Sequence, residues 1–300
     1  MTSPKIAAPN TATRNIAGRK FALIVGGIKC GTTSLFRYLS EHPEIAPCVE
    51  KEPKFFNRRY DRGAKYYKSL WDWKEINDQK VALEATPSYT RFTTRNPENS
   101  AKKIAEFKAQ ENVEFKFIYL LRDPIERIES HYNHSQIYPR TKVRPISEGV
   151  DAELIEISKY AMQIGEYYQR FPAENILLLN FDDFKQDSQA TLVQVCQFLG
   201  IDSNHQFEKS GVVYNSQDQR RKLAFPGLSL LERTGLKSVA SQLLSEERKQ
   251  VARKILGRKQ ARVKLSQGHR DYILKALQED LEHLRSHYGF DVNRWKNVEI

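Results

Sequence analysis

The sequence predicts an α/β fold in which a parallel β-sheet is flanked by helices on both faces. Short apolar runs rich in β-branched residues alternate with segments whose apolar residues recur every three or four positions. This alternation is typical of parallel sheets, because a helix is the usual crossover between two parallel strands. No internal repeat or low-complexity tract interrupts the pattern, so the 300 residues are expected to form a single domain.

Four apolar runs are predicted to be strands, over residues 21–25, 80–84, 115–121 and 176–180. The clearest helix is predicted over 151–171. Its apolar face carries Leu154, Ile157, Ala161, Ile164, Tyr168 and Phe171. Further helices are predicted over 188–199 and 269–288, and Gly200 and Gly289 stand where these two helices would end.

The composition is that of an ordinary soluble globular protein, with 40% hydrophobic and 28% charged residues. No apolar run is long enough to span a bilayer. Residues 1–19 are polar and lack the apolar centre of a signal peptide, so they are expected to form a disordered tail before a domain over 20–300. The three cysteines lack metal-ligand spacing, and an odd count makes a disulfide framework unexpected. A cytoplasmic location is therefore expected.

Positive charge is concentrated towards the C-terminal side of the chain. The formal net charge is +11, and Ser216–Arg262 alone holds 12 Lys and Arg against 4 Asp and Glu. The stretch 215–267 also has a poor periodic pattern with Gly and Pro, so loops and short helices are expected there. Its charge suits a polyanion, an acidic glycan or an anionic membrane surface, and a solvated helical face is an equally good interpretation.

A glycine-rich loop, VGGIKCGTTS over residues 25–34, follows the first predicted strand and precedes a predicted helix. Such a turn directs backbone N–H groups and the positive end of a helix towards an anion, which makes the sheet P-loop-like. The ATP-binding pattern G-x-x-x-x-G-K-[ST] fails here, because Thr32 occupies the lysine position. Lys29 instead lies inside the turn, within reach of the bridging oxygen of a phosphate anhydride. Gly31, Thr32 and Thr33 are then candidates to hold the phosphate itself, and a polar turn that caps a helix is the alternative.

A second candidate segment, LLRDPIERIESHY over residues 120–132, starts at the end of the third predicted strand. Asp123 and Pro124 suit the N-cap and first position of a helix. Arg122 is left at the carboxyl end of the strand, where open α/β sheets bind ligands. Arg122 and Ser130 are therefore candidates to bind a second phosphate, with a salt bridge from Arg122 to Glu126 or Asp123 as the alternative.

Together these segments resemble the 5′-phosphosulfate-binding and 3′-phosphate-binding segments of sulfotransferases that use 3′-phosphoadenosine 5′-phosphosulfate (PAPS). The most similar branch is that of the carbohydrate sulfotransferases, including the heparan sulfate enzymes and their bacterial relatives. KEPKFF at 51–56 is similar to the family's K-E-x-x-F-F, and EATPSY at 84–89 to its E-K-T-P-x-Y. Further similarity at 174–183, at 198–200 and around Tyr288, Gly289 and Trp295 extends the match over most of residues 21–295.

The resemblance implies a role for each candidate residue. Lys29 would stabilise the bridging oxygen between sulfur and phosphate as that oxygen takes charge. Glu52 would remove the proton from the acceptor, with Glu84 the next candidate base and an ion pair with Lys51 or Lys54 the structural alternative. No metal is required, because the transferred sulfuryl group carries less charge than a phosphoryl group. The residues implied to bind PAPS are Lys29, Gly31, Thr32, Thr33, Arg122, Ser130 and Arg220.

Two of these positions depart from the family's pattern. The heparan sulfate enzymes often have a lysine where this chain has Ala85, and Lys54 is a candidate substitute unless it is an ordinary surface lysine. The basic loop that closes over the cofactor is matched only loosely, by residues 215–222, where Arg220 is the candidate.

The expected function is therefore transfer of a sulfuryl group from PAPS to a hydroxyl or amine, on a glycan or glycolipid. A small lipid or secondary metabolite is the alternative acceptor. A different class of function, a non-catalytic protein that binds nucleic acid through Ser216–Arg262, leaves Lys29, Arg122 and Ser130 without a role.

Overall fold

A computed structural model describes residues 16–72, 79–135, 146–208, 222–223, 257–258 and 262–299. Arg220 and nearly all of the basic stretch Ser216–Arg262 lie outside these ranges, so their predicted roles stay predictions. Ile16 falls within the range expected for the tail, yet its side chain is only 1% exposed and belongs to the hydrophobic core. The packed part of the chain therefore begins before residue 20.

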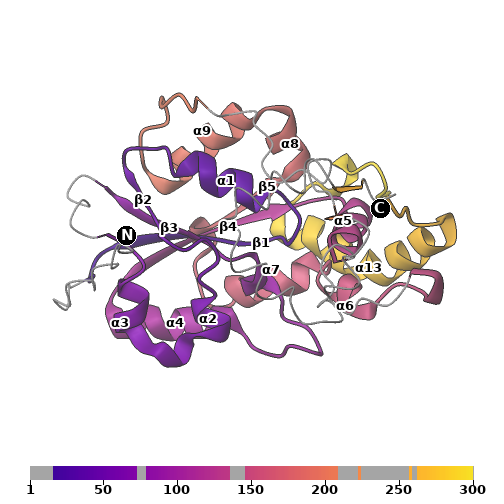
Figure 1. Cartoon of the computed structure of the whole chain (residues 1–300), viewed down its shortest axis with the longest axis horizontal. Coiled ribbons are helices and arrows are strands. Elements are labelled where there is room, and N and C mark those ends of the chain that lie inside the picture. The colour runs from indigo at the N-terminus through magenta and orange to yellow at the C-terminus, as the bar shows by residue number, and fades with distance from the viewer. Residues whose placement is uncertain are drawn as a thin grey trace.

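The centre of the molecule is a parallel sheet of five strands in the order β2-β3-β1-β4-β5, which confirms the predicted fold class (Figure 1). The strands are β1 (Lys20–Gly26), β2 (Ile45–Pro47), β3 (Val81–Ala85), β4 (Glu114–Leu121) and β5 (Ile176–Asn180). The short edge strand β2 has no counterpart among the predicted strands. In the described ranges a separate two-stranded ladder joins β6 (Lys222–Leu223) to β7 (Gly257–Arg258).

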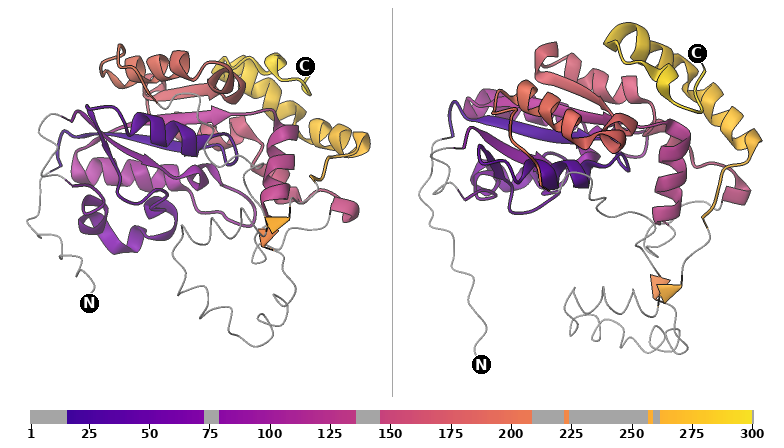
Figure 2. Two further views of the ribbon diagram at one scale, coloured as in Figure 1. Left: turned by 45° about the horizontal axis from the view of Figure 1, so that its top comes forward. Right: turned by 90° about the horizontal axis from the view of Figure 1, so that it is seen from above.

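Helices cover both faces of the sheet (Figures 1 and 2). One layer holds α1 (Thr32–Leu39), α8 (Phe181–Gln186) and α9 (Ser188–Leu199). The opposite side holds α2 (Phe55–Arg58), α3 (Gly63–Lys68), α4 (Ser100–Glu111), α5 (Pro124–Ser135), α6 (Ala152–Glu156), α7 (Tyr160–Tyr168) and α13 (Gln267–Tyr288). No helix in the described part of the chain is both long and apolar enough to cross a membrane.

Burial of both sheet faces explains why the strands are continuous apolar runs. On β1, Phe21, Leu23 and Val25 pack into the core on one face, whereas Ala22 and Ile24 pack into the core on the other. Side chains alternate between the two faces of a strand, so a strand covered on both sides needs apolar residues at every position. The central place of β1 puts the glycine-rich loop that follows it in the middle of the sheet's carboxyl edge.

The helix predicted over 151–171 is divided into α6 and α7, and Arg127 accounts for the break. The carbonyl oxygen of Leu154 accepts hydrogen bonds from Arg127 Nη2 at 2.6 Å and from Ser158 Oγ at 3.0 Å. The backbone N–H of Ser158 turns instead to the carbonyl oxygen of Ile155 at 2.8 Å. The side chain of Arg127, from helix α5, thus donates to a carbonyl oxygen that would otherwise accept a hydrogen bond within a continuous helix. The apolar periodicity of 151–171 does not indicate this contact.

The C-terminal helix begins two residues before its predicted start and ends where it was predicted to end. Ser266 caps α13 by accepting a hydrogen bond from the backbone of His269, and Gly289 ends it in the left-handed conformation at φ 69°. The helix packs against α7 and also reaches α5 and α6. It thereby fixes α5, which carries part of the candidate site.

Candidate functional site

A cleft of about 960 Å³ opens at the carboxyl edge of the sheet, where the loops after β1, β3 and β4 meet. Open α/β sheets bind their ligands at this edge. All but one of the predicted site residues line this cleft, the exception being Arg220, which lies outside the described residues. Those present are Lys29, Gly31, Thr32, Thr33, Glu52, Arg122 and Ser130.

Backbone hydrogen bonds hold the loop between β1 and α1 in place. The backbone N–H of Gly27 donates to the carbonyl oxygen of Leu120 at 2.7 Å, and the buried Cys30 donates its own N–H back to Gly27 at 3.1 Å. Lys29 and Gly31 both adopt positive φ, at 72° and 85°. A Cβ added to Gly31 would lie 2.7 Å from the Phe181 ring, so only glycine fits. The loop thus presents Lys29 and the N-terminus of α1 to the cleft, which suits an anion.

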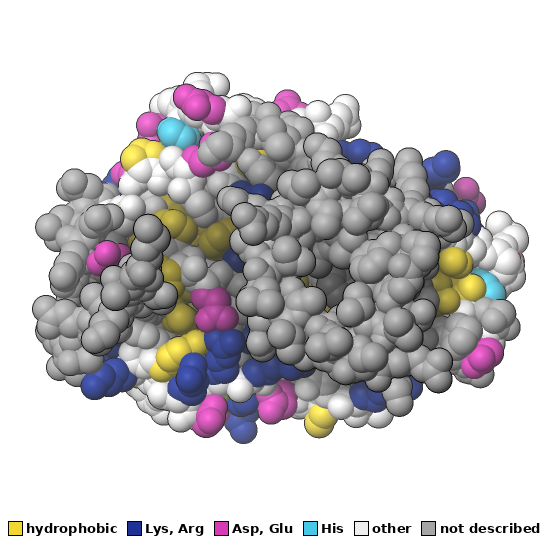
Figure 3. All heavy atoms as spheres, viewed as in Figure 1, with side chains coloured by type: hydrophobic (Ala, Val, Ile, Leu, Met, Phe, Trp, Pro, Cys, Tyr) yellow, Lys and Arg dark blue, Asp and Glu magenta, His cyan; other side chains and the backbone are white. Residues whose placement is uncertain are grey.

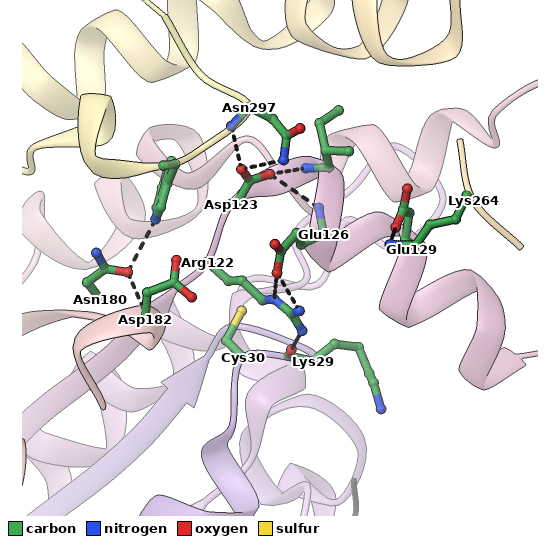
Figure 4. Close-up of polar contacts among 12 residues, drawn as sticks. Lys29, Cys30, Arg122, Asp123, Glu126, Glu129, Asn180, Asp182, Lys264 and Asn297 are labelled. Carbon is green, nitrogen blue, oxygen red and sulfur yellow. Dashed lines mark hydrogen bonds and ion pairs between the residues drawn. The ribbon is translucent and has the colours of Figure 1, made fainter. Parts of the chain in front are cut away.

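Arg122 joins three elements around the loop (Figure 4). Its guanidinium donates to Glu126 Oε2 from Nη2 at 2.7 Å and to the Lys29 carbonyl oxygen from Nη1 at 3.3 Å. The same group lies over the Phe181 ring, 4.8 Å from its centroid. The salt bridge to Glu126, the alternative interpretation of Arg122, is therefore present. Burial raises the pKa of Glu126, but the hydrogen bond and charge of Arg122 outweigh it and leave the pKa below its usual value.

The N-terminus of α5 is capped by Asp123, as predicted. Its Oδ1 accepts hydrogen bonds from the backbone of Ile125 at 2.9 Å and of Glu126 at 3.2 Å. Its Oδ2 accepts two more from Asn297, from the backbone N–H at 2.9 Å and from Nδ2 at 2.8 Å (Figure 4). One carboxylate thus fixes the start of α5 and holds the C-terminal segment against it.

Arg127 is buried in the fold and does not itself line the cleft. Its side chain is fully buried, and besides Leu154 it contacts Ser158 Oγ from Nε at 2.8 Å. Ser130 and His134, three and seven positions further along α5, do line the cleft. The two arginines of the RDPIER segment therefore have different tasks, because only Arg122 reaches the open space.

Glu52 faces the cleft from the segment between β2 and α2. Its backbone N–H donates to the Ala85 carbonyl oxygen at 3.1 Å, and its φ of 61° turns the chain sharply. The carboxylate pairs with Lys51 Nζ at 2.9 Å and lies 3.8 Å from Lys54 Nζ. The ion pairs weighed as the alternative are thus present, yet the Glu52 side chain is still 38% exposed and lines the cleft. Such a carboxylate is both held in place and accessible to a ligand.

The residue that replaces the family's lysine, Ala85, is completely buried. Lys54 lines the cleft instead, and its backbone N–H donates to Thr86 Oγ1 at 3.4 Å. The candidate substitute for the missing lysine is therefore attached to the EATPSY segment and has its amino group beside Glu52.

Glu84 is unsuited to the role of alternative base. Its carboxylate is fully buried, and it is not among the described residues that line the cleft. Burial raises its pKa to about 8, against a smaller lowering by the nearby Tyr89 and Tyr67 hydroxyls. Neither oxygen has a hydrogen bond of good geometry to any described residue. The carboxyl group is consequently neutral near pH 7 and separated from any acceptor.

Further basic side chains of the cleft come from segments that only the tertiary structure brings together, and all except Arg262, the last residue of the basic stretch, were not predicted. They are Arg58, Arg91, Lys185, Arg262 and Lys264, and they share the cleft with the carboxylates of Glu52, Glu126 and Glu129. In Figure 3 Lys and Arg side chains gather around a few carboxylates in the lower middle of the face shown. Lys264 is held by Glu129 at 2.8 Å (Figure 4), and Arg91 donates to Glu153 from Nε at 3.1 Å. The cleft as a whole favours an anionic ligand.

The sequence of this chain is similar to the sequences of known sulfotransferases. A family model described as "Sulfotransferase domain" matches residues 20–283. Human heparan sulfate glucosamine 3-O-sulfotransferase 3B1 is 33% identical over 192 residues, which are 60% of this chain and 46% of that protein. The membrane-associated sulfotransferase kil1 of Dictyostelium discoideum is 39% identical over 126 residues, covering 41% of this chain and 25% of that protein. The chain thus spans about half, or less, of the length of these relatives.

A solved structure shares the fold. A sulfotransferase from Alicyclobacillus acidocaldarius superposes with a TM-score of 0.61 at 19% identity, covering 93% of this chain and all of the other. The family model extends over most of the chain, and its range includes the glycine-rich loop, Glu52 and helix α5. This chain belongs to the sulfotransferase family.

Proposed function

We propose that this protein transfers a sulfuryl group from PAPS to a hydroxyl or amine of a glycan or glycolipid. One observation carries the proposal. A single cleft brings together Lys29 from the loop after β1, Arg122 from the end of β4, Ser130 from α5, and Glu52 from the segment before α2. Two anion-binding positions and an accessible carboxylate are what transfer from a nucleotide with anionic groups at two ends to an acceptor requires.

The described residues fit the two charged ends of PAPS. The N-terminus of α1 and Lys29 suit the 5′-phosphosulfate, because N–H groups and an ammonium all donate to anionic oxygens. Arg122 and Ser130 suit the 3′-phosphate. The first turn of α1 carries no carboxylate that would repel the 5′-phosphosulfate. PAPS supplies the activated sulfuryl group, and the protein supplies binding, orientation and charge stabilisation.

The chemical step needs one group on each side of the sulfur. The bond between sulfur and the bridging oxygen breaks while a bond forms between sulfur and the acceptor oxygen or nitrogen. Lys29 stabilises the negative charge that develops on the bridging oxygen. Glu52 accepts the proton that the acceptor loses, and the partner lysines Lys51 and Lys54 hold its carboxylate in position.

A glycan acceptor is favoured by the relatives and by the charge of the cleft. Several curated relatives are named as sulfotransferases of heparan sulfate glucosamine. Arg58 and Arg91 line the cleft together with Lys54. These cations would attract an acceptor that already carries carboxylate or sulfate groups.

An acceptor screen tests the proposed function. The protein is incubated with sulfur-labelled PAPS and a panel of glycans, glycolipids, lipids and phenols, and products are identified by mass. Label should appear on a sugar hydroxyl or amine, and Lys29→Ala should reduce it. Transfer only to lipids or phenols would assign the alternative acceptor class. No transfer, together with no binding of adenosine 3′,5′-bisphosphate, would refute the proposal.

A further inference from the structure

His131 is a cleft residue that the mechanism above leaves unused. It lies on α5 directly after Ser130, and its partly exposed side chain lines the same cleft as Lys29 and Arg91. A histidine in an active-site cleft invites assignment as an acid or a base. Its contacts point to a different task.

The buried guanidinium of Arg127 determines which ring nitrogen carries the proton. Arg127 Nη1 lies 3.3 Å from His131 Nδ1. A guanidinium has only donors and stays protonated in proteins, so Nδ1 must be the acceptor of this contact. The neutral ring therefore carries its hydrogen on Nε2. Arg127 is itself held by Leu154 and Ser158, so this choice is built into the fold.

The surroundings also keep the ring neutral. Burial comes first, and the positive charges of Arg127, Lys29 and Arg91 and the neighbouring His134 add to it, so the pKa of His131 lies well below its usual range. A ring whose Nδ1 faces a guanidinium and whose Nε2 already bears a hydrogen cannot accept a proton from an acceptor hydroxyl. His131 is thus excluded as a competitor of Glu52 for the role of base.

The Nε2–H group remains available to a ligand. No hydrogen bond to Nε2 occurs among the described residues, and Nε2 is not one of the buried polar atoms without a partner. It therefore faces open space, and the space that His131 lines is the cleft. A fixed donor in a setting made positive by Lys29 and Arg91 is complementary to an anionic oxygen.

We propose that His131 is a further catalytic residue, which donates a hydrogen bond from Nε2 to a non-bridging oxygen of the transferring sulfuryl group. This inference rests on the proposed function. It assigns separate tasks to the three groups at the reacting centre. Lys29 acts on the bridging oxygen, Glu52 on the acceptor proton, and His131 on the sulfuryl oxygens without exchanging a proton.

Two substitutions separate this role from a structural one. In His131→Asn the amide oxygen can still accept from Arg127, but the shorter side chain no longer reaches the cleft. In His131→Gln the longer amide can again place a donor near the position of Nε2. Binding of PAPS is compared with binding of adenosine 3′,5′-bisphosphate, which lacks the sulfuryl group, and kcat is measured alongside.

His131→Asn should weaken PAPS binding and lower kcat by about 10- to 100-fold, the scale of one hydrogen bond to a charged group. Affinity for adenosine 3′,5′-bisphosphate should stay within about twofold of wild type, since that ligand makes no use of the lost donor. His131→Gln should recover part of the loss. Equal losses for both nucleotides, or unchanged PAPS binding and kcat in His131→Asn, would overturn the inference.

Nitrogen NMR of the intact protein tests the tautomer directly. His131 should show a protonated Nε2 and an unprotonated Nδ1, and its ring should titrate well below the usual range of a histidine. A protonated Nδ1, or a titration in that range, would contradict the assignment. If wild-type protein bound neither nucleotide, the proposed function would fail and the inference with it. Normal nucleotide binding with the wrong tautomer would remove the inference alone.

Discussion

The guanidinium of Arg122 donates a hydrogen bond from Nη1 to the carbonyl oxygen of Lys29 at 3.3 Å, across 93 positions of sequence. The side chain of Lys29 extends away from this contact, so its amino group points away from the Arg122 guanidinium (Figure 4). The two residues that are predicted to bind phosphate groups are therefore connected through the backbone of the loop. Arg122 supports the left-handed turn at Lys29 as well as offering its own charge to a ligand.

Nucleotide preference is the first consequence. Adenosine 3′,5′-bisphosphate should raise the melting temperature far more than ATP or AMP does, because only the bisphosphate offers Arg122 and Ser130 a 3′-phosphate. Arg122→Ala should remove most of this preference, since a hydrogen bond to a charged group contributes about 1.5–3 kcal/mol. Glu126→Gln is the control, because it removes the salt bridge and keeps the arginine. A larger thermal shift with ATP would show that the 3′-phosphate is not recognised.

Arg127 should contribute to stability through its buried contacts, in addition to fixing the His131 ring. Arg127→Met should lower the free energy of unfolding by about 1–3 kcal/mol, because the buried carbonyl of Leu154 and hydroxyl of Ser158 lose a donor. Arg95→Ala removes an arginine that is 64% exposed and should change it by less than about 0.5 kcal/mol. Both values come from urea unfolding. Similar small effects for the two variants would show that the buried contacts of Arg127 contribute little.

The buried Glu84 makes stability depend on pH in a defined direction. Its carboxyl has a pKa of about 8 in the folded protein and 4.5 as the ordinary value, so the folded state holds the proton more tightly. The folded state then binds more protons than the unfolded state between pH 4.5 and 8, and stability must fall as pH rises through this window.

Glu84→Gln removes that dependence and keeps the size of the side chain. The stability of the variant relative to wild type should rise with pH across the window, by at most about 1.4 kcal/mol per pH unit. Urea unfolding at pH 5, 6, 7 and 8 measures the difference. A constant difference between the two proteins would mean that Glu84 ionises in the fold as it does in water.

The two lysines beside Glu52 should differ in function. Lys54 lines the cleft and Lys51 does not, although Lys51 lies closer to the carboxylate. If Lys54 replaces the family lysine absent at Ala85, Lys54→Ala should reduce kcat/KM for the acceptor by about tenfold or more, the value of one charge-assisted contact. Lys51→Ala serves as the matched control and should have a smaller effect. The reverse order of effects would assign Lys54 to the solvated surface.

The sequence was sufficient for what depends on neighbouring residues. The glycine-rich loop, the cap at Asp123 and the continuous apolar strands each follow from local pattern, and all are present. Features that depend on distant contacts were not predictable. Arg127 and Arg122 look alike in sequence, yet only the packing of α6 on α5 buries the first.

The same limit applies to Glu84 and His131. Nothing near Glu84 in the sequence indicates that the Tyr67 hydroxyl will lie close to it, and nothing near His131 shows which nitrogen will face Arg127. Burial and tautomer are properties of the assembled core. The family resemblance located the site, and the structure divided its residues between binding and support.

The role of Glu52 is the central claim about chemistry, and Glu52→Gln tests it most directly. The variant keeps the size of the side chain and loses only its ability to accept a proton. Cofactor affinity and single-turnover transfer to the natural acceptor are measured on the same preparation, with Lys29→Ala as the comparison. Lys29→Ala should weaken both cofactor binding and transfer, because the lysine contacts the donor before the reaction. Glu52→Gln should bind the cofactor nearly as wild type does and transfer about 10²–10⁴-fold more slowly, the usual scale for a positioned base. Full activity in Glu52→Gln, or a loss of cofactor affinity in step with activity, would contradict the account and make Glu52 an ion-pair partner of Lys51 and Lys54 only.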